Sequence, residues 1–234
     1  MIATALPRAP SARRRRWGQA YSVSYWRSAR VQKPLLWVLI KRTGDLLLGA
    51  ALLFVSLPLW LLIAAVIKIV SPGPVLFVQE RVGKSGRLFA MYKFRTMVDG
   101  AHLMHKHIAH LNEADGPALK IANDPRLHRV GAFLRRTSLD ELPQLWNVVC
   151  GDMSLVGPRP ALPHEVENYT PHYYQRLTVS PGMTGLWQVS GRASVAFQRW
   201  MAMDVWYARN WSPLVDARIL LQTLPAVVRR EGAW

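Results

Sequence analysis

The chain has 234 residues, enough for one domain with its own hydrophobic core, or for one such domain together with a membrane element. Its formal charge of +16, from 30 Lys and Arg against 14 Asp and Glu, implies a polyanionic neighbour: nucleic acid, an anionic membrane surface or a phosphorylated substrate. The single cysteine, Cys150, excludes an intramolecular disulfide and a cysteine-based zinc site.

Residues 1–40 contain many arginines and several aromatic residues but no acidic residue, so we expect a flexible basic arm. Near an anionic membrane surface, each cation of such an arm contributes about 1 kcal/mol of attraction. A cleavable signal peptide is not expected, because the apolar stretch that follows begins too late and runs too long.

A run of 22 residues without a charge follows at positions 46–67. As a straight helix it would reach about 33 Å, enough to cross a bilayer core of about 30 Å. Pro58, two residues after Ser56, predicts a break or kink near the middle. Because lysines and arginines flank the run on both sides, the positive-inside rule places both ends in the cytoplasm. We therefore expect residues 41–70 to form a re-entrant membrane hairpin, with a kinked crossing as the alternative.

A β-hairpin is predicted next, with strands at 75–82 and 87–95 joined by a glycine-containing turn. The alternation of a strand puts Lys93 and Arg95 on one face, together with Phe89 and Met91. Two cations beside apolar neighbours suit a phosphate, whereas a solvated strand face is the alternative.

Four histidines, at positions 102, 105, 107 and 110, follow the hairpin. Three-residue spacing can put two of them on one helix face, but no HExxH motif accompanies them. We expect a solvated or variable helix here, with a metal site as the alternative.

Asp140 and Glu141 form a consecutive acidic pair in a chain that is otherwise strongly basic. Ser138 and Glu141 have the spacing of a capping box, but that assignment would place Pro143 inside the helix. If Asp140 is the N-cap instead, Pro143 falls in the first turn, where it is tolerated. The positive end of a helix dipole attracts both carboxylate and phosphate, so a cation is expected between them. Mg²⁺, which takes one or two carboxylates plus substrate phosphates, fits this position.

Arg159 lies between two prolines, directly after a short predicted strand at 155–156. The prolines fix the backbone, so the guanidinium is a preorganised donor for a bidentate phosphate contact, with a rigid surface turn as the alternative. Further along, we expect a turn at 180–185, a strand at 186–189, and helices at 196–209 and 214–228. The tryptophans at 200, 206 and 211 indicate either a face against the membrane or ordinary core packing.

Several motifs, all in one order, resemble the bacterial sugar transferases, which are monotopic polyprenyl-phosphate phosphoglycosyl transferases. The motifs are Lys41-Arg42 before the apolar run, YKFRTM at 92–97, NDPR at 123–126, LDELPQ at 139–144, GDMSLVGPRP at 151–160 and PGMTGLW at 181–187. The similarity runs from about Lys41 to the C-terminus and is closest to the short exopolysaccharide-initiating hexose-phosphate transferases. One departure is that Leu57 separates Ser56 from Pro58, which the family often has adjacent.

The resemblance implies an α+β, predominantly helical fold with a re-entrant membrane helix-break-helix, amphipathic interfacial helices and a small β-hairpin around the active site. Residues 71–234 would be a catalytic domain on the cytoplasmic face of the bacterial inner membrane. The implied reaction transfers a sugar 1-phosphate from a nucleoside diphosphate sugar, here expected to be a UDP-hexose, to undecaprenyl phosphate and releases UMP.

The resemblance also implies roles for individual residues. Asp140 would be the nucleophile that forms a covalent aspartyl phosphosugar, and Glu141 would help it to hold Mg²⁺. Phosphate or carrier contacts are expected from Lys93, Arg95, Arg159 and Arg192, and an orienting role from Asp152. The implied partners are the UDP-sugar, undecaprenyl phosphate and anionic lipids; a homodimer is compatible with this interpretation, and no nucleic acid is expected.

Two other classes of protein fit parts of the pattern. A non-catalytic basic membrane scaffold would keep the apolar run and the charge but would not need Asp140. A nucleic-acid-binding protein would explain the charge, but the apolar run and the lack of a recognisable DNA- or RNA-binding motif argue against it.

Overall fold

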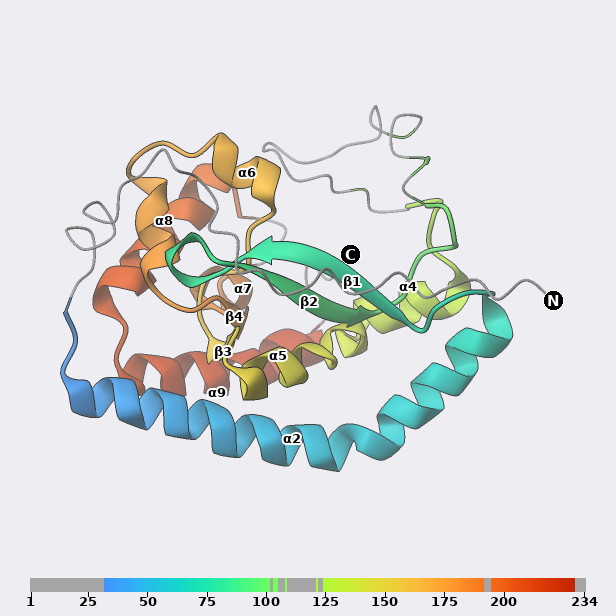
Figure 1. Ribbon diagram of the computed structural model, residues 1–234, viewed down its shortest axis with the longest axis horizontal. Helices are drawn as coiled ribbons and strands as arrows, with labels where there is room; N and C mark the ends of the chain where they lie inside the picture. The colour runs from blue at the N-terminus through green and yellow to red at the C-terminus, as the bar shows by residue number, and fades with distance from the viewer. Residues whose placement is uncertain are drawn as a thin grey trace.

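The computed structural model describes residues 32–101, 103–104, 108, 121, 124–191 and 195–229. Within these ranges the protein is predominantly helical, and its strands form two small two-stranded sheets (Figure 1). This agrees with the expected α+β, mainly helical class. Residues 1–31, the four histidines and Arg192 lie outside the described residues.

The apolar run forms helix α2, Leu35–Val70, which begins six residues before the expected boundary at Lys41. By length and composition α2 is long and apolar enough to cross a membrane. Its backbone is helical throughout, so the expected helix-break-helix is instead one continuous helix with Pro58 inside it. Figure 1 shows that this helix is bent, and an interior proline causes such bends because it cannot donate to the carbonyl four residues earlier.

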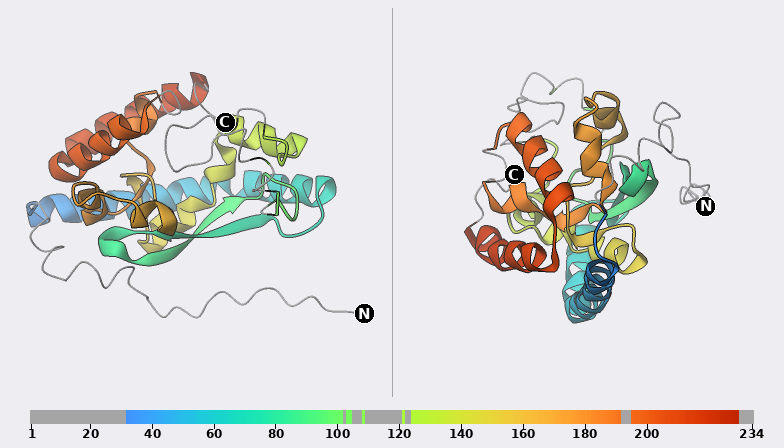
Figure 2. Two further views of the ribbon diagram at one scale, coloured as in Figure 1. Left: turned by 90° about the horizontal axis from the view of Figure 1, so that it is seen from above. Right: turned by 90° about the vertical axis from the view of Figure 1, so that its left-hand side faces the viewer.

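α2 forms one edge of the molecule, and Figure 2 shows the other elements gathered on one side of it. Most of its apolar side chains are exposed; Phe54 and Val55, for example, are 75% and 76% exposed. The buried residues of α2 are Asp45, Gly49, Ile63 and Ile67. A soluble helix with so much exposed apolar surface would be unfavourable in water, so this surface calls for an apolar environment.

Polar side chains near the start of α2 bind it to the rest of the protein. Lys41 Nζ lies 2.6 Å from Asp216 Oδ2 and donates to the Val156 carbonyl at 3.0 Å. Asp45 Oδ1 accepts from the Leu155 N–H at 2.9 Å. The charges at this end are therefore not only membrane flanks, as expected from the sequence, but also anchor the helix to residues 155 and 156.

The predicted β-hairpin is confirmed. Strands β1, Leu76–Val82, and β2, Leu88–Phe94, pair antiparallel through a short turn, η1, Lys84–Gly86. Facing residues include Arg81 with Phe89. Because directly opposite residues of an antiparallel pair share a face, Arg81 lies on the same face as Phe89, Met91 and Lys93.

The second sheet is a parallel pair of β3, Ser154–Val156, and β4, Gly182–Thr184. Between them run α6, Pro163–Glu167, and η4, Tyr173–Thr178. The strands meet where two glycines touch: a Cβ on Gly182 would lie 2.0 Å from the Gly157 nitrogen.

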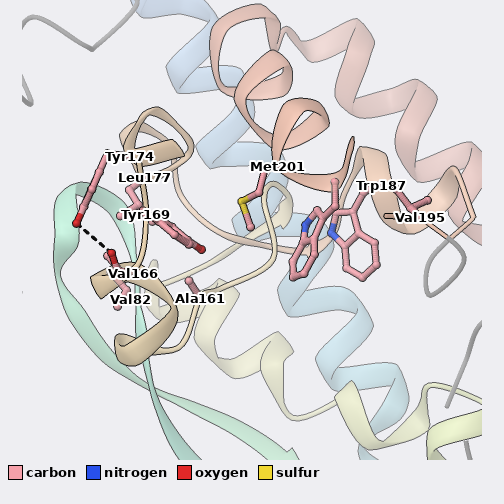
Figure 3. Close-up of a cluster of buried hydrophobic side chains, with 10 residues drawn as sticks. Val82, Ala161, Val166, Tyr169, Tyr174, Leu177, Trp187, Val195 and Met201 are labelled. Carbon is pink, nitrogen blue, oxygen red and sulfur yellow. Dashed lines mark hydrogen bonds between the residues drawn. The ribbon is translucent and has the colours of Figure 1, made fainter. Parts of the chain in front are cut away.

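The strand expected at 186–189 is wrong, because these residues form the short helix α7, Leu186–Val189. The strand, Gly182–Thr184, begins four residues earlier, at the contact between Gly182 and Gly157. In α7, Trp187 turns into the core (Figure 3). Its ring packs against that of Trp200, with the ring centroids 4.7 Å apart. The buried Trp187 indole therefore belongs to a short helix and not to a strand.

The two C-terminal helices are confirmed as α8, Phe197–Asn210, and α9, Pro213–Arg229. Trp200 and Trp211 are buried, whereas Trp206 is 47% exposed. Core packing therefore explains two of the three tryptophans. α8 and η4 pack around the cluster of Figure 3, and α9 packs on α7 and on α2.

Candidate active site

The acidic pair lies in a 3-10 turn and not at the start of an α-helix. Residues Leu139–Glu141 form η3, and the helix α5, Gln144–Cys150, begins only after Pro143. The expectation that Asp140 caps α5 is therefore wrong. The N–H groups of Glu141 and Leu142 donate to carbonyls three residues earlier, and Pro143, which has no N–H, interrupts this pattern before it continues at Leu145 and Trp146.

The capping box with Ser138 does not form. Ser138 has a left-handed backbone, with φ of 58°, and its side chain makes no capping hydrogen bond. The Glu141 carboxylate instead reaches the hairpin, where Oε1 accepts from Lys93 Nζ at 2.7 Å. This contact joins the acidic turn to β2.

Asn147 fixes α5 against the free edge of β2. Its side chain is 1% exposed, Nδ2 donates to the Ala90 carbonyl at 2.7 Å, and Oδ1 accepts from the Tyr92 N–H at 3.1 Å. Lys93 directly follows Tyr92, so this backbone contact also sets where the Lys93 ammonium meets Glu141.

Asp140 is a buried carboxylate in a basic environment, with 6% of its surface exposed. Burial raises the pKa of Asp140 to about 6; the Lys93, Arg135 and Arg159 cations oppose this rise, and the Glu141 carboxylate adds to it. At neutral pH the carboxylate is therefore mainly ionised and poorly solvated. A carboxylate nucleophile that attacks a phosphate needs this combination.

Arg135 is a residue that the sequence analysis missed as a site candidate. It stands near the end of α4, Arg129–Arg136, and its Nε donates to Thr96 Oγ1 at 3.1 Å. Burial lowers the pKa of Arg135, and the Asp140 carboxylate opposes that effect. The sequence offers one indication of this role, because only a tight turn separates Arg135 from the acidic pair.

The Pro158-Arg159-Pro160 turn is held through its carbonyls. The Gly182 N–H donates to the first carbonyl at 2.9 Å, Arg176 Nη2 to the second at 2.8 Å, and Arg81 Nη1 to the third at 2.9 Å. Arg81 and Arg176 are both buried. The turn is thus fixed by hydrogen bonds in addition to its prolines, and the position of the Arg159 side chain follows from this.

These elements surround an open pocket. It is lined by Arg81, Met91, Lys93, Glu141, Gln144, Arg159, Pro160, Gly182, Met183 and Gln188. Three cations against one carboxylate favour an anionic ligand. Asp140 does not line this pocket, although it directly precedes Glu141 in η3.

Arg81 lines the pocket but is not among the candidates that the sequence patterns indicate. The alternation along β2 was used to place Lys93, but it was not extended across the turn to β1. The hairpin register, with Arg81 opposite Phe89, would have added it. Burial and the Arg159 charge lower the pKa of Arg81 to about 10, because two guanidinium groups share this region.

Besides Asp140, the expected site residues Arg95 and Asp152 do not line this pocket either. The Arg95 guanidinium is buried against the end of α2, where it donates to the carbonyls of Ser71 and Pro72 at 2.6 and 2.5 Å. It therefore stabilises a helix end and not a shared phosphate site with Lys93. Asp152 is exposed. Burial raises the pKa of the Cys150 thiol, and the negative charge of Asp152 adds to this rise. Arg192 lies outside the described residues.

The donor set suits a hard divalent cation. Among the described residues, no group of three or more His, Cys, Asp or Glu side chains could hold a metal. Asp140 and Glu141 offer carboxylate oxygens next to an anion-attracting pocket, which fits Mg²⁺ because this ion is commonly held by one or two carboxylates together with substrate phosphates. A cage made by the protein alone is not needed for such an ion.

Comparisons with known proteins point to one family. The profile of the family described as bacterial sugar transferase matches residues 36–230. The undecaprenyl-phosphate galactose phosphotransferase of Salmonella typhimurium is 43% identical over 201 residues, 83% of this chain and 42% of that protein. The UDP-galactose-lipid carrier transferase of Erwinia amylovora is 41% identical over 199 residues, again 83% of this chain and 42% of the relative.

A shorter relative matches over most of its length. The exopolysaccharide production protein ExoY of Rhizobium meliloti is 40% identical over 198 residues, which are 83% of this chain and 88% of the relative. The chain thus spans less than half of the first two relatives but most of this one. Because the family profile covers most of the chain, this protein belongs to the bacterial sugar transferase family.

Proposed function

We propose that this protein transfers a sugar 1-phosphate from a UDP-hexose to undecaprenyl phosphate, releases UMP, and so begins the membrane stage of exopolysaccharide, capsule or O-antigen synthesis. The observation that carries this proposal is the buried Asp140 carboxyl group next to Glu141, beside a pocket lined by Lys93, Arg81 and Arg159. The names of the Salmonella and Erwinia relatives, which refer to galactose and a lipid carrier, support the same substrate class.

The first step uses the Asp140 carboxylate as the nucleophile. One of its oxygens attacks the phosphorus that bears the sugar, and the bond from that phosphorus to the oxygen bridging the two phosphates breaks. UMP leaves with the bridging oxygen and its electron pair, and the sugar phosphate stays on Asp140 as an aspartyl phosphosugar. No proton transfer is needed, because both the nucleophile and the leaving group are anions.

The second step regenerates the carboxylate. A phosphate oxygen of undecaprenyl phosphate attacks the same phosphorus, the bond to Asp140 breaks, and the product is the lipid-linked diphosphate sugar. Lys93 and Arg159 hold the anionic groups close together, and their fixed positions lower the cost of bringing several negative charges into one pocket. When bound by Asp140 and Glu141, Mg²⁺ would neutralise phosphate charge.

The proposed location is the cytoplasmic face of the bacterial inner membrane. The exposed apolar side chains of α2 need a lipid environment, and Lys41 and Asp45 on the same helix anchor β3. β3 leads directly into the Pro-Arg-Pro turn of the site. We therefore propose that the bent helix α2 lies in the membrane with both of its ends at the cytoplasmic face, so that the pocket stays where a soluble nucleotide sugar and a lipid phosphate both arrive.

The direct test is a substrate panel. Membranes that contain the protein are incubated with undecaprenyl phosphate, Mg²⁺ and each of several UDP-sugars, and release of UMP is measured. We expect UMP release with at least one UDP-hexose that depends on the lipid phosphate, on Mg²⁺ and on Asp140. If the protein stays in the membrane but releases no nucleotide from any of these donors, the result would favour the alternative function, a non-catalytic membrane scaffold.

A further inference from the structure

Exposed apolar side chains follow one another at the start of β1, between the end of α2 and the pocket. Leu76, Phe77 and Val78 are 37%, 46% and 52% exposed. The same strand continues to Arg81, which is buried and lines the pocket. The proposed chemistry gives the three apolar residues no role. Neighbouring exposed apolar side chains mark a surface that contacts something other than water, so this segment requires a partner.

Leu76 and Val78 belong to the face of the hairpin that is turned towards α2. Leu76 lies opposite Phe94, whose ring packs against Trp60 of α2 with the ring centroids 5.6 Å apart. Val78 is two residues further along the strand and therefore shares this face. The apolar environment of α2 accounts for the exposure of both side chains.

Phe77 belongs to the other face of the hairpin, which carries the pocket. It is directly opposite Lys93 in the hairpin register, so the two side chains are neighbours. Lys93 lines the pocket and donates to the Glu141 carboxylate at 2.7 Å. Phe77 itself does not line the pocket. Its ring therefore lies at the edge of the pocket, next to a cation that is expected to hold phosphate.

The start of β1 is fixed against the end of α2. The buried Arg95 guanidinium donates to the carbonyls of Ser71 and Pro72. The Arg95 N–H donates to the Val75 carbonyl at 2.9 Å. Ile69, in the last turn of α2, is 83% exposed, and Figure 1 shows that β1 starts near this end of the helix. Exposed apolar side chains thus continue from the membrane helix to the edge of the pocket.

A ligand that fits this position combines a phosphate with an apolar chain. Lys93 attracts the phosphate, and the half-exposed ring of Phe77 beside it favours an apolar group. In a polyprenyl phosphate the isoprenoid chain is attached directly to the phosphate. A nucleotide sugar carries polar groups on both sides of its diphosphate, so it matches an apolar surface that continues to the membrane less well.

We propose that Phe77 is a carrier-binding residue whose ring contacts the isoprenoid chain of the lipid phosphate, next to the phosphate group at Lys93. This inference rests on the proposed function and deepens it, because it assigns a binding surface to the second substrate. The contact removes the exposed part of the ring from water, which favours binding of the carrier. The first half of the reaction, on the nucleotide sugar, does not need this ring.

The test measures the two halves of the reaction separately, with the full chain. Exchange of labelled UMP into the UDP-hexose requires only that the aspartyl phosphosugar forms and reverses, whereas product formation also requires the carrier. Phe77→Ala should lower kcat/KM for undecaprenyl phosphate about 5- to 10-fold, the effect of losing part of the burial of an aromatic side chain. The rate of UMP exchange should stay at the wild-type value.

Two further variants serve as controls. Phe77→Leu retains an apolar side chain and should recover most of the lost kcat/KM, whereas a stacking contact between Phe77 and uracil would not be recovered by leucine. Val78→Ala shortens an exposed apolar side chain on the opposite face of the same strand. It should leave both UMP exchange and transfer to the carrier unchanged.

All rates are measured in membranes and again in detergent micelles that contain undecaprenyl phosphate. A direct contact with the carrier predicts the same loss for Phe77→Ala in both. A loss confined to membranes would assign the ring to the surrounding lipid, and slower UMP exchange by a folded Phe77→Ala protein would assign it to the nucleotide sugar. Either result would overturn the inference, as would wild-type kinetics for Phe77→Ala or an equal loss for Val78→Ala.

Folding is checked by the melting temperature in detergent. If Phe77→Ala does not fold, Phe77→Thr, which is polar but favours a strand, replaces it in the same comparison. Failure of the proposed function is a separate result, because the wild-type protein would then show neither UMP exchange nor transfer to the carrier.

Discussion

Arg176 donates from Nη2 to the Arg159 carbonyl at 2.8 Å, and the same Nη2 lies 2.5 Å from Asp204 Oδ2. Both side chains of this ion pair are only 1% exposed. Arg176 Nε also donates to Asp204 Oδ2 at 3.0 Å, and Nη1 donates to the Tyr169 hydroxyl. A buried cation that pairs with Asp204 therefore also holds the turn that carries Arg159.

We predict that Arg176→Met destabilises the protein by about 3 to 5 kcal/mol, because it leaves the Asp204 carboxylate buried without its cation. Thermal unfolding in detergent measures the change. Arg199→Met is the control, since Arg199 is an exposed residue on the same helix as Asp204. An equal loss of stability in both variants would contradict the prediction.

The double variant Arg176→Met/Asp204→Leu separates stability from positioning. Replacing both partners of a buried ion pair by apolar residues often restores most of the stability. We expect UMP release to stay low in this variant, because the Arg159 carbonyl still lacks the donor that fixes the turn. Recovery of both stability and activity would show that Arg176 has no positioning role.

Asp140→Asn should abolish transfer without releasing the protein from the membrane, because the amide cannot act as the nucleophile. The measurements are UMP release and retention in a membrane pellet at high salt. A covalent mechanism also predicts ping-pong kinetics. A variant with near-normal activity, or kinetics that require a ternary complex, would contradict the role of Asp140.

The same substitution predicts a pH dependence of stability in the presence of a chelator. The Asp140 carboxyl has a pKa of about 6 in the folded protein against an ordinary value of 3.8. Between these values the unfolded state binds fewer protons, so wild-type stability falls as the pH rises, by up to about 3 kcal/mol at roughly 1.4 kcal/mol per unit. Asp140→Asn should lack this fall in stability. If the free energies of unfolding of the two proteins change with pH in parallel, the raised pKa of Asp140 is refuted.

The sequence was sufficient for the elements whose signals are local. Alternation in the hairpin placed Lys93 correctly, and the unusual acidic pair led to Glu141, which meets it. The start of α5 was misplaced because it depends on how the chain passes Pro143, where a 3-10 turn competes with an N-cap. The same residues around Pro143 are compatible with both the 3-10 turn and the N-cap.

Other features depend on contacts between distant segments and could not be derived from patterns. β4 depends on the close contact between Gly182 and Gly157. The pattern of apolar residues along the chain does not predict a contact of this kind. Arg95 fits the alternation of β2, but it lies just past the strand and turns to the end of α2. Lys41 looked like a membrane flank, and only the fold reveals Asp216 as its partner.

Lys41→Met should destabilise the protein by about 3 kcal/mol, because the Asp216 carboxylate then loses its cation in a largely buried position. Burial raises the pKa of Asp216, and Lys41 opposes this effect, so the carboxyl should protonate more readily in the variant. Lys68→Met, at the exposed far end of α2, is the control and should change stability by less than about 0.5 kcal/mol. Equal melting temperatures for the three proteins would argue against a docking role.

The final prediction concerns the path of α2, because a bent helix fits both a re-entrant hairpin and a kinked crossing. In a Cys150→Ala background, single cysteines are introduced at exposed positions before and after the helix, Gln32→Cys and Arg87→Cys. If both ends are cytoplasmic, a membrane-impermeant thiol reagent should label neither in intact spheroplasts and both after lysis. Labelling of one of the two cysteines before lysis would instead establish that α2 crosses the membrane. The proposal that both ends of α2 lie at the cytoplasmic face would then be wrong.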